Sequence, residues 1–186
     1  MQHKLTTPVT REDLAPLRAG DTVLLSGVVY TARDAAHKRM MELLDQGKPL
    51  PFPVEGSALY YVGPTPERPG QVIGSAGPTT SGRMDAYAPA MLSVGARGMI
   101  GKGARLPQVI EAMKKYSGVY FGATGGAGAL LARCIKKSEL IAYEDLGAEA
   151  LRKLYVEDMP LVVIIDSEGR NLYEEGRAAY LKHHTK

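Results

Sequence analysis

The sequence predicts an α/β domain with a mixed sheet and flanking helices, and three observations lead to this fold class. The chain has 186 residues, of which 45% are hydrophobic and 23% charged, a composition typical of one globular domain. Strand-like apolar segments alternate with helical patterns through the middle of the sequence, which favours parallel strands there. Strand-like segments at either end lack this alternation, which favours antiparallel pairing. We expect residues 1–186 to form a single domain whose tail, about 178–186, frays.

The first third of the chain predicts a brief helix, a strand and a longer helix. Thr10 and Asp13 have the spacing of a capping box, in which each side chain bonds to the other residue's backbone N–H. Gly27 interrupts an apolar run, which predicts a buried strand bulged at the glycine. Asp34 can cap the next helix, whose apolar residues recur at helical spacing, and Gly47 can end it. The expected ranges are 11–17, 21–32 and 35–46.

The middle of the chain predicts short strands separated by helices. Pro89 must kink the helical pattern that follows Met84 or limit it to short pieces. Pro107 suits the first turn of the next helix, where a backbone N–H is not needed. The expected strands are 58–62, 71–75, 98–101, 119–123 and 140–143, and the expected helices after Pro89 are 106–116 and 127–137.

The last third changes character, because its apolar segments have no helical period. Leu151–Val156 and Leu161–Ile165 predict two strands, with Glu157-Asp158 as a polar turn that ends the first. Asp166–Gly169 carries a hairpin turn signal. We therefore expect Asn171–Tyr173 to return antiparallel to the second strand.

Charge and hydropathy exclude two classes of partner. The net charge is +3, the basic residues are scattered, and there is no tryptophan, so nothing predicts a nucleic-acid surface. The longest aliphatic run, Leu161–Ile165, is far shorter than the roughly 20 apolar residues of a membrane span. The first residues lack the apolar core of a signal peptide. We expect a cytoplasmic protein that contacts neither membrane nor nucleic acid.

A single cysteine limits the metal chemistry of this chain. Cys134 cannot form an internal disulfide, and alone it cannot hold zinc or an iron–sulfur cluster, which need about three or four protein ligands. Its place on an apolar helix face predicts buried packing. No metal site is expected within the chain, and any such metal must come from another chain.

Three segments combine a strand end, flexible backbone and a fixed positive charge: Thr31–Asp34, Pro78–Arg83 and Gly101–Gly103. Ligands of open α/β sheets bind at the carboxyl ends of the strands, and free N–H groups of the next helix favour anions there. We therefore expect an anionic small molecule as the ligand.

The side chains of these segments suit carboxylates. The Thr-Thr-Ser-Gly-Arg run from Thr79 to Arg83 offers hydroxyls, backbone N–H groups exposed by a glycine, and a guanidinium that can grip a carboxylate with two hydrogen bonds. Arg33 or Lys102 could hold a second carboxylate.

Plainer interpretations exist for each residue taken alone. Arg33 beside Asp34 also fits a surface charge next to a helix cap. Lys102 between two glycines also fits a simple turn. His37 fits a surface or core histidine better than a catalyst.

Nucleotide binding fails in detail. A P-loop would need glycine where Ala96 stands and Ser or Thr where Gly103 stands. The glycine-rich run Gly125–Gly128 resembles half of a dinucleotide loop, but Leu131 takes the place of the third glycine. This run instead favours close packing of a helix start on the sheet.

Four segments stand in order along the chain: Thr31–Lys38, Gly77–Asp85, Gly98–Gly103 and Ala123–Ala129. Together they resemble the β subunit of a two-chain class I fumarate hydratase, a pattern that also forms the C-terminal domain of single-chain members. The resemblance covers nearly the whole chain and implies a swivelling β/β/α domain. It also implies an α subunit as partner, which would hold a [4Fe-4S] cluster with three cysteines of its own.

The resemblance further implies a hydro-lyase reaction, the reversible hydration of fumarate to (S)-malate, with the chain inactive without its α subunit. In the family the matching residues contact substrate, which assigns substrate binding to Arg33, Arg83 and Lys102 and proton transfer to Thr79. L(+)-tartrate dehydratase β subunits share the arginine-bearing and threonine-bearing segments and stay an alternative. A non-catalytic carboxylate-binding or regulatory module is the further alternative.

Overall fold

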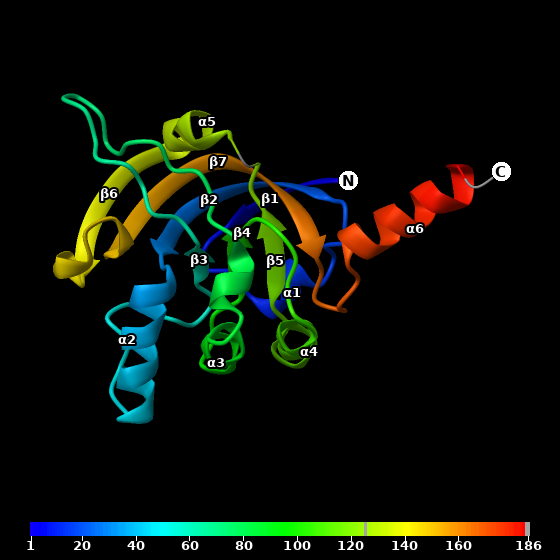
Figure 1. Cartoon of the computed structure of the whole chain (residues 1–186), viewed down its shortest axis with the longest axis horizontal. Coiled ribbons are helices and arrows are strands. Elements are labelled where there is room, and N and C mark those ends of the chain that lie inside the picture. Colours follow the sequence, from blue (N-terminus) through cyan, green and yellow to red (C-terminus); the bar gives the residue numbers. More distant parts are fainter. Residues whose placement is uncertain (125, 185–186) are drawn as a thin grey trace.

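The structure is a computed structural model that describes residues 1–124 and 126–184 (Figure 1). Within these residues seven strands form one mixed sheet in the order β1-β2-β3-β4-β5-β7-β6. The strands are β1 Gln2–Thr6, β2 Thr22–Thr31, β3 Ala58–Tyr60, β4 Gly98–Gly101, β5 Val119–Gly122, β6 Ile135–Ala142 and β7 Leu151–Ile165. The helices are α1 Arg11–Leu14, α2 Asp34–Asp45, η1 Ser81–Met84, α3 Ala88–Ser93, α4 Pro107–Tyr116, α5 Gly128–Cys134, η2 Glu144–Glu149 and α6 Leu172–His184.

The sheet closes on itself. Strands β2, β3, β4 and β5 are parallel neighbours, β7 runs antiparallel to β5, and β7 also pairs antiparallel with β2. Figure 1 shows α2, α3 and α4 beside one another on one side of this sheet and α5 on the other. The predicted α/β fold class with a mixed sheet and flanking helices is confirmed.

Two cores hold the layers together, and neighbouring residues of one strand enter different cores. Tyr60 and Phe121 belong to the core that the closed sheet surrounds, which we call the inner core. Leu59, Met99 and Tyr120 belong to the core beneath the helices. Side chains of a strand alternate between its faces, so β3, β4 and β5 are buried on both faces, as is usual for parallel strands under helices. This burial fixes the positions of their ends, from which the candidate segments emerge.

Several local predictions are confirmed. The Thr10–Asp13 capping box is present at α1. The bulge in β2 lies between Leu25 and Gly27, and a Cβ at Gly27 would stand 2.5 Å from the hydroxyl of Thr7. Helix α4 begins at its proline, and the segment around Pro89 forms two short helices, η1 and α3.

One predicted strand and one predicted turn are wrong because local patterns do not show long-range pairing. Residues 71–75 form no strand; they lie in a loop in which Thr65 and Ser75 exchange hydrogen bonds. Leu151 to Ile165 is one strand, because the expected turn at Glu157-Asp158 is an irregular point within it. Asp158 has a φ of 46° and its N–H donates to the hydroxyl of Ser26.

Other predicted element ends differ as well. Asp34 is the first residue of α2 and Arg33 takes the cap position, without a capping hydrogen bond from its side chain. The helix predicted to reach residue 137 ends at Cys134, because β6 pairs with β7 from Ile135 onward. The expected turn at 166–169 is present, but only Asn171 bridges to Ile165 before α6 begins.

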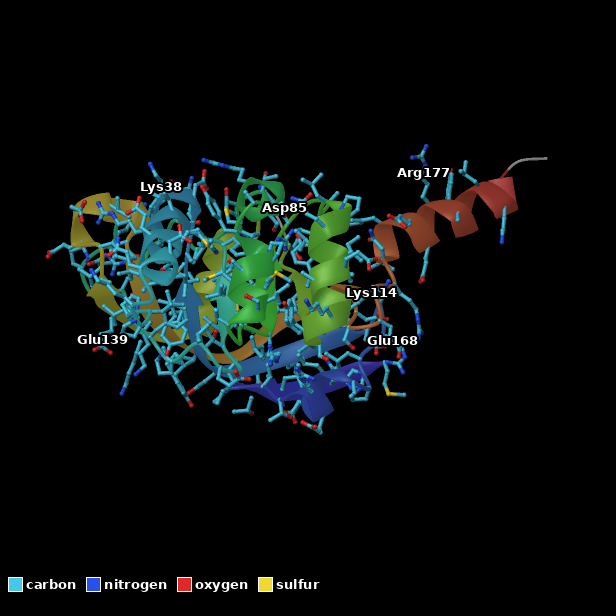
Figure 2. The ribbon with its side chains drawn as sticks, turned by 90° about the horizontal axis from the view of Figure 1, so that it is seen from below. Lys38, Asp85, Lys114, Glu139, Glu168 and Arg177 are labelled. Carbon is cyan, nitrogen blue, oxygen red and sulfur yellow. The ribbon has the colours of Figure 1, made fainter. Side chains whose placement is uncertain are left out.

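Helix α6 projects from the rest of the molecule in both views, with Arg177 labelled on it in Figure 2. It continues to His184, and residues 185–186 of the predicted tail lie outside the described residues. Among the described residues, no helix combines the length and the apolar character that crossing a bilayer requires.

Candidate active site

The carboxyl ends of β2, β3 and β4 meet at one edge of the sheet, which we call the site edge. Thr31 is the last residue of β2 and Gly101 the last residue of β4, so the rest of each segment follows its strand directly. Pro78–Arg83 reaches the same edge although no strand precedes it. After the loop at 63–77 the chain returns, and the N–H of Thr79 donates to the carbonyl oxygen of Tyr61 at 2.7 Å. The structure therefore brings the three predicted segments together.

A glycine allows this close approach. The N–H of Ser81 donates to the carbonyl oxygen of Lys102 at 2.8 Å, and Thr80 bridges to Lys102. A Cβ at Gly101 would stand 2.0 Å from the hydroxyl oxygen of Ser81 and 3.0 Å from the ring of Tyr61. Only a residue without a side chain lets the Thr79 segment lie against the end of β4.

Arg33 stands at the start of α2 and is held by a carboxylate. Its guanidinium lies 3.0 Å from Glu149 at the end of η2, and the other oxygen of Glu149 accepts from the N–H of Ala35 at 3.2 Å. A Cβ at Gly63 would come within 2.6 Å of the Arg33 guanidinium, so this glycine leaves room for it. Glu149 carries no local sequence signal, because it reaches the site edge from more than a hundred residues away.

Arg83 pairs with Asp34, the first residue of α2. Both side chains are partly exposed, 49% for Arg83 and 32% for Asp34, so a ligand can reach the pair from solvent. Because Asp34 follows Arg33 directly, the two predicted arginines stand on either side of one helix start. An acidic residue in the first turn also stabilises that helix start.

Thr79 and Lys102 lie side by side at the site edge, Thr79 on the segment that returns after the loop and Lys102 directly after β4. Thr79 is half-buried, whereas Thr80 and Lys102 are exposed. Gly103 has a φ of 86°, which turns the chain away after Lys102. Sequence reasoning predicted both residues for the site edge, and both are there.

Beneath the site edge lies a buried polar group that sequence reasoning missed. Arg105 and Asp85 form an ion pair at 2.6 Å, with side chains 0% and 1% exposed. The Arg105 guanidinium carbon lies 5.4 Å from the ring centre of Tyr61 and 4.9 Å from that of Tyr120. Figure 2 shows Asp85 toward the same end of the helical layer as Lys38 of α2. The sequence signal for this ion pair was incomplete, because a sequence without its fold does not show whether an Asp or an Arg is buried or exposed.

His37 is a core residue, as the plainer interpretation predicted. Its side chain is fully buried, with ring centres of Tyr61 and Tyr87 each at 5.6 Å. Burial lowers the pKa of His37 to about 4, so the imidazole is neutral near pH 7. Nδ1 lies 2.9 Å from the carbonyl oxygen of Arg33, and because that oxygen only accepts, Nδ1 carries the proton.

The residues that the structure describes do not form a metal centre. Among residues 1–124 and 126–184, no group of three or more His, Cys, Asp or Glu could hold a metal ion. Cys134 is half-buried against the inner core, and its thiol lies 3.8 Å from the carbonyl oxygen of Leu130. The prediction that Cys134 is buried is therefore confirmed only in part.

The glycine-rich run allows close packing at a helix start, and its nearest neighbour is a loop. Gly125 lies outside the described residues. Gly128, at the start of α5, is buried, and a Cβ there would stand 2.3 Å from the hydroxyl of Ser75 and 2.9 Å from the nitrogen of Gly77. The start of α5 therefore packs against the loop that precedes Thr79, while Leu131 of the same helix is buried in the core with side chains of the sheet.

The site edge as a whole suits a small anion with two carboxylates. Three cationic side chains, Arg33, Arg83 and Lys102, stand with two carboxylates, Glu149 and Asp34. The carboxylates orient the guanidiniums and leave an excess of positive charge. Thr79 adds a hydroxyl, so the edge can bind a dicarboxylate and offers one group that can exchange a proton.

Comparisons with known proteins show what this chain is similar to. A family described as Fumarase C-terminus matches residues 1–176. "Fumarate hydratase 2" of Leishmania major is 40% identical over 167 residues, which cover 89% of this chain and 29% of that protein. "Fumarate hydratase class I, anaerobic" of Escherichia coli K12 is 41% identical over 153 residues, which cover 81% of this chain and 28% of that protein.

A third relative has nearly the length of this chain. "Putative L(+)-tartrate dehydratase subunit beta" of Methanocaldococcus jannaschii is 36% identical over 173 residues, which cover 90% of this chain and 89% of that protein. The chain therefore spans less than a third of the fumarate hydratases named above and most of the tartrate dehydratase subunit.

Proposed function

Because the chain belongs to the Fumarase C-terminus family, whose named relatives are hydro-lyases, we propose that it is the β subunit of an iron–sulfur fumarate hydratase. The reaction is the reversible addition of water to fumarate, which gives (S)-malate. The observation that carries the proposal is the meeting of Arg33, Thr79, Arg83 and Lys102 at one sheet edge from three separate segments.

The cationic residues bind the two carboxylates of the substrate. A guanidinium can hold a carboxylate with two parallel hydrogen bonds, which fixes its orientation as well as its position. Glu149 and Asp34 hold the guanidiniums of Arg33 and Arg83 before substrate binds, so less conformational freedom is lost on binding. Lys102 adds a third positive charge at the end of β4.

Thr79 transfers the proton that the hydration reaction adds to or removes from a substrate carbon. The hydrogen bond from its N–H to the carbonyl oxygen of Tyr61 holds its backbone at the site edge. An aliphatic hydroxyl is a weak base, and the positive charges of the site edge favour its deprotonated form. This role is the most demanding part of the proposal.

The cofactor and the rest of the site come from a partner. Because the described residues of this chain do not fit a metal centre, the [4Fe-4S] cluster belongs to an α subunit that covers the site edge. The cluster supplies Lewis-acid chemistry when bound. The present chain binds and orients the dicarboxylate and moves a proton at Thr79.

The test is reconstitution with a separately expressed α subunit under anaerobic conditions, with fumarate and L(+)-tartrate as substrates. We expect the chain alone to be folded, iron-free and inactive, and the mixture to hydrate fumarate. A stoichiometric iron–sulfur spectrum from this chain alone would contradict the shared site. Hydrogen exchange after mixing should show protection at the three segments of the site edge, and protection elsewhere only would contradict the docking face.

A tartrate dehydratase subunit is the second candidate, and one observation favours it. The tartrate dehydratase relative matches over 89% of its own length, whereas the two fumarate hydratases above are matched over less than a third of theirs. Faster turnover of L(+)-tartrate than of fumarate in the same assay would select this candidate. The complex could also bind dicarboxylates with normal cluster content and turn over neither substrate. That result would favour a non-catalytic carboxylate-binding module.

A further inference from the structure

Two buried arginines lie near the two ends of β4. Arg97 precedes the strand and Arg105 follows it, and both residues are less than a tenth exposed. Arg97 donates to the carbonyl oxygen of Leu92 in α3, to that of Ala96 after this helix, and to the carboxylate of Glu55. These contacts have a structural role. Arg105 instead lies beneath the site edge, where its contacts lead to all three candidate segments.

We propose that Arg105 is a positioning residue of the active site, which holds the Arg33, Thr79 and Lys102 segments in one arrangement without touching substrate. This inference rests on the proposed function of the site edge. Its basis is geometric: Arg105 is the member of the buried group that contacts Asp85, Tyr61 and Tyr120 together.

The ion pair with Asp85 connects η1 to α4. Asp85 directly follows η1, which carries Arg83. One oxygen of Asp85 accepts from Nε of Arg105 at 2.6 Å, and the other accepts from the N–H of Leu106 at 2.7 Å. Both charges are buried, so neither can be removed without leaving the other uncompensated. The position of η1 therefore depends on Arg105.

The two tyrosine rings connect Arg105 to the Thr79 and Lys102 segments. The carbonyl oxygen of Tyr61 accepts the hydrogen bond from the N–H of Thr79. The hydroxyl of Tyr120 donates to the carbonyl oxygen of Gly103 at 2.9 Å and lies 2.9 Å from the hydroxyl of Ser81. A guanidinium stacks on aromatic rings and keeps donors in its own plane for a carboxylate. Lysine cannot make both kinds of contact with the same geometry.

His37 extends the group to the first segment. Its ring meets the ring of Tyr61 edge-on at 5.6 Å between centres, and its Nδ1–H donates to the carbonyl oxygen of Arg33. Burial, and after it the charge of Arg105, lowers the pKa of His37, which keeps the imidazole neutral. Arg105, Tyr61 and His37 thus form a continuous buried connection from Asp85 to Arg33.

The experiment compares variants of Arg105 with matched variants of Arg97 in the reconstituted complex. The variants are Arg105→Lys, the double variant Arg105→Met with Asp85→Asn, Arg97→Lys and Arg97→Met. Asn at 85 keeps an acceptor for Leu106 and removes the unpaired charge, so the double variant is expected to fold. Melting temperature and cluster content are measured for every complex, followed by kcat and KM for fumarate.

We expect the double variant to lower kcat/KM by about tenfold or more, because small displacements of binding groups are costly to catalysis. Arg105→Lys should restore part of the loss. The Arg97 variants should lower the melting temperature and leave kcat/KM within about twofold of the wild type. Equal kcat/KM for the Arg105 and Arg97 variants, at similar melting temperatures, would overturn the proposal.

Hydrogen exchange of the full chain gives a readout that does not need activity. The N–H groups of Thr79 and Ser81 bond to Tyr61 and Lys102, so they report the arrangement of the site edge. We expect their exchange to quicken in the Arg105 variants and to stay unchanged in the Arg97 variants. Unchanged exchange in all variants would also overturn the positioning role. An inactive wild-type complex would refute the proposed function instead, and the exchange result would still decide the role of Arg105.

Discussion

The two ends of the parallel strands use arginine in opposite ways. At the amino end, the side chain of Arg97 is 9% exposed and donates to the backbone carbonyl oxygens of Leu92 and Ala96 as well as to Glu55. At the carboxyl end, Arg33 and Arg83 are 20% and 49% exposed and pair with carboxylates.

The difference in exposure and partners distinguishes an arginine that supports the structure from arginines that can bind a ligand. Arg97 bonds to buried backbone carbonyl oxygens that no ligand can reach, so its contacts contribute to stability. A carboxylate that is partly exposed can share its guanidinium with a ligand or be rehydrated. The site edge is therefore the end at which substitutions should change activity, and the opposite end is the one at which they should change stability.

The largest expected effect tests the hydroxyl of Thr79. Thr79→Val keeps the branched shape and removes the hydroxyl, so it should lower kcat by about 10²- to 10⁴-fold in the reconstituted complex, the range for general acid–base catalysis. Thr80→Val is the matched control on the same segment and should have a milder effect. A Thr79→Val complex with normal cluster content and more than about a tenth of the wild-type kcat would make Thr79 a positioning residue instead.

The second prediction concerns the pH dependence of stability, because a buried histidine, His37, lies beneath the site edge. The pKa of its imidazole is lowered to about 4 by burial, whereas an unfolded histidine has a pKa of about 6.5. Between these values only the unfolded chain binds the proton, so stability falls as the pH falls from about 6.5 toward 4. The loss should reach up to about 3 kcal/mol.

Urea unfolding of the chain at several pH values measures this loss. His37→Asn keeps a donor toward the Arg33 carbonyl and should remove most of the slope. The carboxyl of Asp21 has its pKa lowered to about 2 by the N-terminal ammonium, so its own contribution is lost only below about pH 4. The same slope in the wild type and in His37→Asn would show that another group titrates in this window.

The sequence predicted the site edge better than it predicted the strands that lead there. Arg33 and Lys102 were placed correctly because each directly follows an apolar run that forms a strand. Thr79 was placed correctly for a wrong reason, since the strand expected at 71–75 does not exist. Its true support is the hydrogen bond to Tyr61 and the missing side chain at Gly101.

The carboxylate partners were not predictable, for a physical reason. Glu149 meets Arg33 only because η2 comes to lie beside α2, and nothing local to Glu149 shows that contact. Arg105 and Asp85 are charged residues in the core, and sequence patterns assign such residues to the surface. Burial of an ion pair depends on tertiary packing, which hydrophobic periodicity does not report.

The third prediction compares arginines from the two ends directly. Arg33→Met in the complex should lower kcat/KM by about 10- to 100-fold, because charge-assisted hydrogen bonds contribute roughly 1.5–3 kcal/mol. Its effect on the melting temperature should be small, since the Arg33–Glu149 pair is partly exposed. Arg97→Met should do the reverse and lower the free energy of unfolding by about 1–3 kcal/mol. Similar losses of kcat/KM in Arg33→Met and Arg97→Met would show that the two ends of the strands do not differ in function.

The smallest expected effect tests whether geometry or charge matters at Arg83. Arg83→Lys keeps the positive charge and loses the two-pronged grip on a carboxylate, so kcat/KM should fall by about tenfold. Arg39→Lys is the matched control, because Arg39 also pairs with an aspartate, Asp145, through a partly exposed side chain, yet belongs to the middle of α2. It should leave kcat/KM unchanged. If Arg83→Lys behaved like this control, charge alone would suffice at that position, and Arg33 together with Lys102 would have to orient both carboxylates of the substrate.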